Sequence, residues 1–383
     1  MVAIDSYAGG DGRLSPLSTP SATRAVLEAH GIGTKYTLGQ NFLVNDDVLK
    51  KIIALAEVGE NDRVLEVGPG IGTLTIALLK HAASVIAIER DPDLPAVLAD
   101  TLHPWREKFA LIEKDALDVT RDDIVSVAST MVEPGGDTGC PDRASSAANE
   151  TAQWAVSQSE DCLSESRYRV VVPQEELRPS LPSKLVANLP YAVAATVVLD
   201  YFENFPFLDS ATIMVQKEVA DRMAAAVGTK NYGAYTVKLG LYAEPVGRFA
   251  VGPGNFFPPP RVDSAVIRLN RRVPLMADGA PASPEVIAAA ALMADAAFTS
   301  RRKTIANSCK TYFSGRGPIL LGVADSSAVE GAPTIALPDG AATAERLPAI
   351  FEAAAIDPRR RGETLTQQEF LALGAALLRV TAA

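Results

Sequence analysis

The 383-residue sequence predicts an α/β protein, in which a mostly parallel sheet with crossover helices precedes a small helical domain. Short apolar runs alternate with helical patterns from residue 62 to 118, and this alternation resumes at residue 184. Such an order is typical of a parallel sheet. The first apolar run breaks into a glycine-rich turn that leads directly into a helix. Beyond residue 284 only helical patterns remain, interrupted by one Gly/Ala/Pro-rich stretch.

The glycine-rich turn indicates what the sheet holds. An apolar strand over residues 64–67 is followed by Gly68-Pro69-Gly70-Ile71-Gly72 and by a helical pattern over residues 73–79. Glycines let the backbone approach a ligand where a Cβ would collide. The spacing is G-x-G-x-G with Glu66 two residues ahead, rather than the G-x-G-x-x-G of dinucleotide-binding turns. It resembles the S-adenosylmethionine turn of Rossmann-like methyltransferases, although glycines at a strand end can also form a simple tight turn.

Two further acidic residues follow predicted strands. The second strand, residues 85–88, ends at Glu89, where a carboxylate suits the two hydroxyls of a ribose. The third, residues 109–112, leads to Asp115, whose carboxylate is placed to accept from an adenine amino group. Either acid alone is more often a solvated loop residue. Their repetition at successive strand ends favours a nucleoside-binding edge.

The segment Asn188-Leu189-Pro190-Tyr191 after the strand 185–187 carries the predicted chemistry. The Asn188 side-chain oxygen and the Leu189 carbonyl can accept the two hydrogens of an exocyclic amine, which makes its nitrogen a better nucleophile. Proline fixes the backbone, and Tyr191 offers a stacking face worth about 1–3 kcal/mol per base. The alternative for the tetrapeptide alone is an Asn-Pro turn that leaves a strand.

With these motifs the chain resembles the ribosomal RNA adenine dimethyltransferases, specifically the bacterial small-subunit branch. The similar segments occur in the family's order and span about residues 20 to 375. They are Lys35–Leu43, Glu66–Gly72, Asn188–Tyr191, Gln216–Arg222, Phe257–Ser264 and Phe298–Ile305. The resemblance implies a Rossmann-like, S-adenosylmethionine-dependent methyltransferase sheet with a small C-terminal helical domain.

The resemblance also implies roles for individual residues. Donor contacts are expected from Asn41, Leu43, Gly68, Glu89, Asp115 and Asn188. Asn188, Leu189 and Tyr191 would serve the target adenine, with Phe257 packing against it. The implied reaction is N6,N6-dimethylation of two adjacent adenosines near the 3′ end of 16S (small-subunit) rRNA, during biogenesis of the small ribosomal subunit.

The domain organisation follows from composition. We expect a disordered tail over residues 1–18, a methyltransferase domain over 19–273 and a helical domain over 284–383. Residues from about 119 to 183 are expected to be a polar, acidic insertion, because a strand–helix connection normally needs only about 2–6 residues beyond its helix. It is either a flexible surface excursion or a docking loop for a partner. A second insertion is expected over about 314–343.

Further elements are expected along the chain. A further strand of the sheet is expected over residues 211–215, and Ser264–Leu269 is expected to be the strand that closes the sheet. Helices are expected over 23–29, 196–202, 216–226, 284–298, 301–312, 347–354 and 367–378.

Composition narrows the class of protein. The three cysteines, Cys140, Cys162 and Cys309, form no C-x-x-C pair, and only three histidines are present, so no metal site is expected. The sequence shows no signal pattern, no run of eighteen apolar residues and no heptad seam, so a cytoplasmic monomer without membrane contact is expected.

The net charge of −10 is unusual for a protein that binds RNA. Its distribution resolves most of the conflict. Residues 119–183 hold eleven acids and five bases, a net of −6, whereas residues 184–315 hold fourteen bases and ten acids, a net of +4. Local potential steers a partner more than total charge does.

Two basic clusters are candidates for RNA binding. Arg301, Arg302 and Lys303, with Lys310 nearby, are expected on an exposed helix face, and Arg359, Arg360 and Arg361 in a loop. Either cluster alone can be an ordinary solvated surface. Beside an adenine-type catalytic loop, contacts with rRNA phosphates are favoured.

Three other functions remain open. A related enzyme acts on large-subunit rRNA and confers antibiotic resistance, and a DNA adenine methyltransferase would share residues 188–191. A ribosome-assembly factor would mainly bind a pre-ribosomal particle, with methylation secondary. Segments 216–222 and 298–305 and the loop Arg359–Glu363 favour the small-subunit enzyme.

Overall fold

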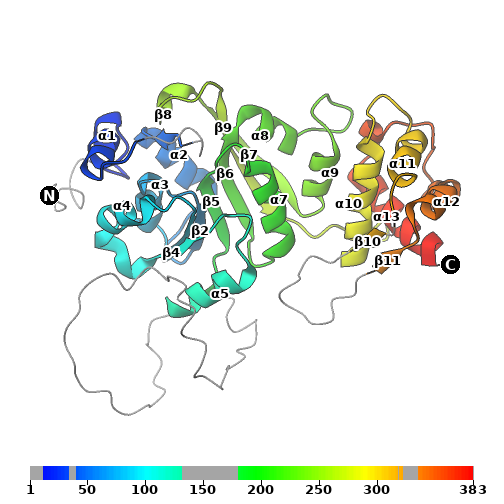
Figure 1. Ribbon diagram of the computed structural model, residues 1–383, viewed down its shortest axis with the longest axis horizontal. Coiled ribbons are helices and arrows are strands. Elements are labelled where there is room, and N and C mark those ends of the chain that lie inside the picture. Colours follow the sequence, from blue (N-terminus) through cyan, green and yellow to red (C-terminus); the bar gives the residue numbers. More distant parts are fainter. Residues whose placement is uncertain (1–11, 34–39, 132–179, 318, 322–334, 383) are drawn as a thin grey trace, which may run out of the picture. The chain divides into compact units, whose positions relative to one another are not determined.

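The computed structural model describes residues 12–33, 40–131, 180–317, 319–321 and 335–382 (Figure 1). The chain divides into two compact units. Unit 1 comprises residues 1–197, 207–215 and 248–266, and unit 2 comprises residues 198–206, 216–247 and 267–383. This division differs from the expected boundary near residue 273, because residues 198–206 and 216–247 group with the C-terminal helices.

Residues 12–18 are ordered, which corrects the expectation of a disordered tail to residue 18. The backbone N–H groups of Leu14 and Ser15 donate to Asp46 Oδ1 at 2.8 and 3.2 Å, and the Leu17 side chain is fully buried. Helix α1 (Pro20–Ala29) follows, capped by Thr19, whose side chain accepts from the Ala22 N–H. The rest of the predicted tail, residues 1–11, lies outside the described residues.

A seven-stranded sheet forms in the order β4-β3-β2-β5-β6-β9-β7. Its strands are β2 (Arg63–Val67), β3 (Ser84–Glu89), β4 (Phe109–Glu113), β5 (Lys184–Asn188), β6 (Ser210–Gln216), β7 (Ala243–Val251) and β9 (Ser264–Arg271). The pairs β2–β3, β3–β4, β2–β5 and β5–β6 are parallel, as predicted. The strand order reverses between β2 and β5, and ligands of open α/β sheets bind at such a point.

Strand β7 corrects the expectation that residues 264–269 close the sheet. Strand β9 lies between β6 and β7, so β7 is the edge strand. Most of β7 is exposed or half-exposed between two buried ends. An edge strand that carries Glu, Pro and Gly has no apolar alternation from which it could be recognised.

In unit 1, helices and a 3₁₀ segment accompany the sheet. They are α2 (Asp46–Ala56), α3 (Thr73–Leu79), α4 (Leu94–Thr101), η3 (His103–Lys108) and α5 (Arg121–Thr130). Helix α3 contacts β3, and α5 contacts β3 and β4 (Figure 1). The core consists of aliphatic residues from the strands and from α2, α3 and α4. A second, two-stranded sheet pairs β1 (Phe42–Leu43) with β8 (Phe256–Phe257), after the 3₁₀ turn η6 (Pro253–Asn255).

Helix α5 occupies the start of the segment predicted as an acidic insertion. Thr120 and Asp123 form a reciprocal capping box at its first turn, and Ile124 is fully buried. Residues 121–130 are therefore the crossover helix after β4, since the capping signal and the buried face make an ordinary amphipathic helix. The remainder of the predicted insertion, residues 132–179, lies outside the described residues.

Unit 2 is mostly helical. Its helices are α8 (Lys217–Met223), α9 (Ala234–Gly240), α10 (Pro284–Phe298), α11 (Ile305–Phe313), α12 (Gly340–Ala353) and α13 (Gln367–Ala382), with the 3₁₀ turn η7 (Gly362–Thr364). Helix α7 (Ala194–Asn204) has residues in both units. Helix α10 contacts α9, α11 and α13. A Cβ on Gly374 of α13 would lie 2.6 Å from the Ala290 nitrogen of α10, so these helices pack backbone to backbone.

Regular structure also occupies part of the predicted second insertion. Strands β10 (Ile319–Leu321) and β11 (Ile335–Leu337) pair antiparallel, and α12 begins at Gly340 rather than at residue 347. The Asp339 side chain caps α12 by accepting from the Ala342 N–H. None of the described helices is long and apolar enough to span a membrane.

Candidate active site

The predicted site residues of unit 1 follow the ends of the central strands. The glycine turn follows β2, and Asn188 is the last residue of β5. Strands β2 and β5 are neighbours on either side of the point where the strand order reverses. A Cβ on Gly68 would lie 3.7 Å from Pro190 Cδ, so the two loops are in contact. The structure thus brings together two motifs that are 120 residues apart in the sequence.

The glycine turn needs its glycines. Gly68, Gly70 and Gly72 have φ values of 70°, 60° and 88°, in the left-handed region that other residues rarely adopt. A Cβ on Gly70 would also lie only 3.1 Å from the Phe42 ring. The turn therefore needs glycine both for its backbone conformation and for the close approach of Phe42.

Glu66 is a buried carboxyl beneath this turn. Its side chain is 1% exposed, and its Oε2 has no hydrogen-bond partner within the described parts of the chain. Burial raises the pKa of Glu66 to about 8, with a smaller contribution from the charge of Glu89. The sequence shows this acid ahead of the first glycine but does not indicate that burial raises its pKa.

Glu89 ends β3 and is held by backbone. The N–H groups of Arg90 and Asp91 donate to its Oε1 at 2.9 and 2.8 Å, and the nearby Gly70 N–H, like them, acts to lower its pKa. Burial raises the pKa of Glu89 above its ordinary value. The ribose-binding candidate is thereby connected to the glycine turn.

Asp115, the adenine-binding candidate, is paired with a cation. Arg90 Nη1 lies 2.7 Å from Asp115 Oδ2, and the Leu117 N–H donates to Oδ1 at 3.1 Å. Its side chain remains 31% exposed. A carboxylate oxygen can accept more than one hydrogen bond, so Asp115 retains capacity for an amino group.

Asn188 is oriented by the backbone of Asn41. Its Nδ2 donates to the Asn41 carbonyl at 3.1 Å, which leaves Oδ1 without a partner in the described chain. The next residue, Leu189, is buried, and its N–H donates to the Met214 carbonyl at 3.1 Å. The predicted donor residue Asn41 therefore also sets which atom of Asn188 is available to accept.

The small β1–β8 sheet brings further candidates to this edge. Phe42 pairs with Phe257 and Leu43 with Phe256, and Phe42 packs on Gly70. The Leu43 side chain is buried, whereas Phe257 is partly buried with the Arg24 guanidinium 5.3 Å from its ring centroid. Residues 35–39 of the predicted lid segment lie outside the described residues. The Tyr191 hydroxyl lies 2.6 Å from Ser264 Oγ.

These residues fit S-adenosylmethionine. The turn holds three glycines in the left-handed conformation, the buried Glu66 lies in β2 directly before it, and its Oε2 has no partner within the described residues, while the buried Glu89 ends the neighbouring strand β3. Within the described residues no cluster of His, Cys, Asp or Glu could hold a metal ion. Cys309 is a free, buried thiol, and the other two cysteines lie outside the described chain.

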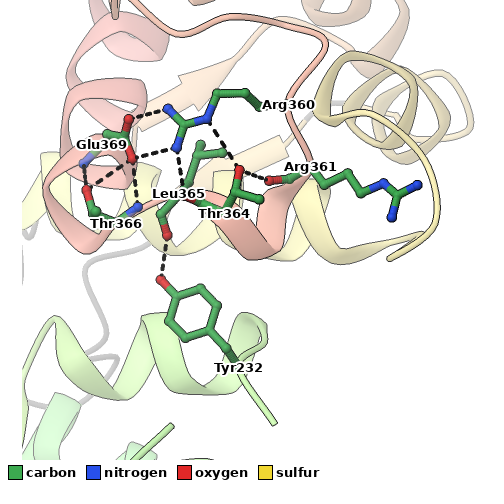
Figure 2. Close-up of polar contacts among 7 residues, drawn as sticks. All are labelled: Tyr232, Arg360, Arg361, Thr364, Leu365, Thr366 and Glu369. Atoms are coloured by element: carbon green, nitrogen blue, oxygen red, sulfur yellow. Dashed lines mark hydrogen bonds and ion pairs between the residues drawn. The ribbon is translucent and has the colours of Figure 1, made fainter. Parts of the chain in front are cut away.

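The basic residues proposed to bind RNA belong to unit 2, and they differ in their hydrogen-bond partners and exposure. Arg301 donates to the carbonyls of Lys230 and Thr229 and pairs with Glu363. Arg360 forks between Glu369 and Thr364, while the Arg361 guanidinium extends away from this network (Figure 2). Arg359 pairs with Asp357 but is 87% exposed. Arg301 and Arg360 thus bond to other residues of unit 2, whereas the side chains of Arg359 and Arg361 are exposed to solvent.

Arg301, Arg302 and Lys303 do not lie on a helix face, which corrects the expectation of a helix over residues 301–312. They form the turn before α11, which begins at Ile305 because Thr304 caps it by accepting from the Asn307 N–H. An open hollow of about 740 Å³ lies over the start of α11. It is lined by Arg302, Lys303, Thr304, Asn307, Lys310, Thr311 and Ser314.

Comparisons with known proteins show the family of this chain. The sequence model of the family described as "Ribosomal RNA adenine dimethylase" matches residues 33–334. A protein of Geobacillus sp. (strain WCH70) named "Ribosomal RNA small subunit methyltransferase A" is 33% identical over 364 residues, which cover 95% of this chain and 98% of that protein. A protein of Enterococcus faecalis with the same name is 32% identical over 365 residues, or 94% and 96% of the two chains.

A solved structure shares the fold. The crystal structure of a dimethyladenosine transferase from Plasmodium falciparum superposes with a TM-score of 0.52 at 20% identity, and covers 87% of this chain and 95% of that one.

Proposed function

Because this chain belongs to the ribosomal RNA adenine dimethylase family, we propose that it dimethylates the N6 amines of two adjacent adenosines near the 3′ end of 16S (small-subunit) rRNA. It uses S-adenosylmethionine as the methyl donor, and it acts in the biogenesis of the small ribosomal subunit. The observation that carries the proposal is the contact between the glycine turn and the Asn188–Tyr191 loop at neighbouring strand ends.

S-adenosylmethionine supplies an activated methyl group. Gly68, Gly70 and Gly72 would line its backbone cradle, Glu89 would accept its ribose hydroxyls, and Asp115 its adenine amine. Asn41, Leu43 and Asn188 complete the proposed donor contacts. Phe42 and Leu43 of β1 and Phe256 of β8 are buried, and Phe42 packs on the glycine turn.

The protein activates the amine by accepting its hydrogens. The adenine N6 lone pair is delocalised into the ring, so the free amine is a weak nucleophile. Asn188 Oδ1 and the Leu189 carbonyl accept its two hydrogens and favour the tetrahedral nitrogen that attacks. The Asn41 backbone carbonyl supports this role because it accepts from Asn188 Nδ2, at the end of the amide opposite Oδ1. The methylated nitrogen is acidic and loses its proton to water, so no general base is required.

Alignment of the amine with the methyl group supplies the rest of the rate enhancement. Reacting atoms must be aligned at roughly 3–3.5 Å. Tyr191 stacks on the target base, and Phe257 packs against it. After the first transfer the amine has one hydrogen left, so one of the two acceptors loses its partner. The second transfer therefore depends more strongly on stacking than the first does.

The hollow over α11 is the proposed RNA-backbone contact. Arg302, Lys303 and Lys310 supply positive charge there, and the other lining residues supply hydroxyl and amide groups. Arg359 and Arg361 add exposed cations in the same unit. Arg301 and Arg360 support this surface from within the fold. Such contacts position RNA without reading its sequence.

The direct test is transfer from labelled S-adenosylmethionine to small ribosomal subunits that lack N6 methylation. Protein-free large-subunit rRNA serves as the competing acceptor, and the products are digested to nucleosides. Dimethyladenosine from the small subunits alone is the expected result. Label on the large-subunit RNA would move the assignment to the resistance enzymes. Binding without transfer would favour an assembly factor.

A further inference from the structure

The hydroxyl of Tyr191 is held by a residue far away in the sequence. Tyr191 Oη and Ser264 Oγ lie 2.6 Å apart, across seventy-three positions, and both residues belong to unit 1. Ser264 is the first residue of β9 and has no exposed surface. In the part of the chain that the structure describes, neither hydroxyl bonds to any other group. Ser264 thus bonds to the far end of the tyrosine ring from within the sheet.

The backbone around Tyr191 is already fixed by other bonds. The Pro190 carbonyl accepts from the N–H groups of Val193 and Ala194 at 3.2 and 3.1 Å, and the Leu189 N–H bonds to β6. What these bonds leave undetermined is the direction of the Tyr191 ring, which turns about two side-chain torsions. The bond to Ser264 removes that freedom. A phenylalanine would offer the same stacking surface, but nothing would hold its ring.

We propose that Ser264 is the positioning residue of the target-base pocket: it holds the Tyr191 ring in the orientation that stacks on the adenine. The inference rests on the proposed function and extends it to a residue outside the catalytic loop. Ser264 touches neither substrate in this role and acts only through Tyr191. Its effect is therefore on alignment of the amine, not on affinity for the methyl donor.

The second methyl transfer is the step that should depend most on this bond. The monomethylated amine has lost one hydrogen bond to the Asn188–Leu189 acceptors, so stacking carries more of its placement. Loss of the Ser264 hydroxyl should then slow the second transfer more than the first. Monomethyladenosine would accumulate, which a general loss of folded enzyme would not produce.

The test uses Ser264→Ala in single-turnover transfer to unmethylated small subunits. We expect the first transfer to slow by about 3–10-fold, the size of one lost hydrogen bond. We also expect a higher ratio of monomethyl to dimethyl product, a lower kcat with little change in KM, and unchanged affinity for S-adenosylhomocysteine. Ser210→Ala is the matched control, because Ser210 is likewise a buried first residue of a sheet strand. It should leave the product ratio as in the wild type.

Tyr191→Phe removes the other partner of the bond and retains the ring. It should shift the product ratio in the same direction, and the double variant should be no slower than the slower single variant, since both lose one shared bond. If Ser264→Ala does not fold, the Tyr191→Phe ratio alone decides. An unchanged ratio in these variants, or losses that multiply in the double variant, would overturn the role of Ser264. Absence of any methyl transfer by the wild type would instead refute the proposed function.

Discussion

At the scale of single residues, Asn188 has the most direct part in the proposed chemistry. Removing one oriented polar group from an active site typically costs about 10²–10³ in turnover. Asn188→Ala should show a loss of this size in single-turnover methyl transfer. Asn204→Ala is a suitable control, because Asn204 is also partly buried and bonds to Asp200 outside the site. A loss below about tenfold would contradict the proposed role.

Glu66 should make stability depend on pH. Its folded-state pKa is about 8, against an ordinary value of 4.5. As pH rises between these values, the unfolded chain loses the proton while the folded chain keeps it, so the folded state is destabilised. Glu66→Gln removes this effect. The quantity to measure is the free energy of unfolding of the variant minus that of the wild type, from urea denaturation. We expect this difference to be more favourable to the variant at pH 8 than near pH 4.5. An equal difference at both pH values would refute a raised pKa.

At the scale of elements, the Asp46 carboxylate is one of the groups that attach the segment 12–18. Asp46 Oδ1 accepts from the backbone of Leu14 and Ser15 and lies 3.3 Å from Ser18 Oγ. Asp46→Ala should lower the free energy of unfolding by about 1–3 kcal/mol, because buried donors lose their acceptor. Asp47→Ala, whose side chain is 82% exposed, should change it by less than about 0.5 kcal/mol. Chemical denaturation of both variants measures the difference, and equal losses would argue against the attachment.

Element prediction succeeded where the signal is local. Helices α3 and α10 match their predicted bounds, residues 73–79 and 284–298, because the apolar pattern of each follows directly on a local start signal, the glycine turn for α3 and the Ser283 cap for α10. The turn before α11 was predicted as helix, since Arg301, Arg302 and Lys303 have good helix propensity. The cap at Thr304 decided otherwise.

At the scale of the whole molecule, RNA binding has to overcome a net charge of −10. Each phosphate neutralised contributes about −0.7 to −0.9 to the slope of log affinity against log salt. Arg302→Ala and Lys303→Ala should each weaken binding to the small subunit and make this slope shallower. Arg106→Ala is the control, because Arg106 is an exposed cation of unit 1 that pairs with Glu107. Filter binding over a salt series measures the slopes, and unchanged slopes would remove this surface from the RNA contact.

The sequence alone determined the parallel strands, the glycine turn and the Asn188–Tyr191 loop, because apolar runs, glycines and the Asn-Leu-Pro-Tyr segment are encoded in consecutive residues. Only the tertiary structure decided that β7 is the edge strand, that Phe42 pairs with Phe257, that Asn188 bonds to the Asn41 carbonyl and that Ser264 bonds to Tyr191. Each of these depends on which distant segments meet. A hydrogen bond between residues 73 or 147 positions apart leaves no trace in local composition, since either partner by itself is an ordinary polar residue.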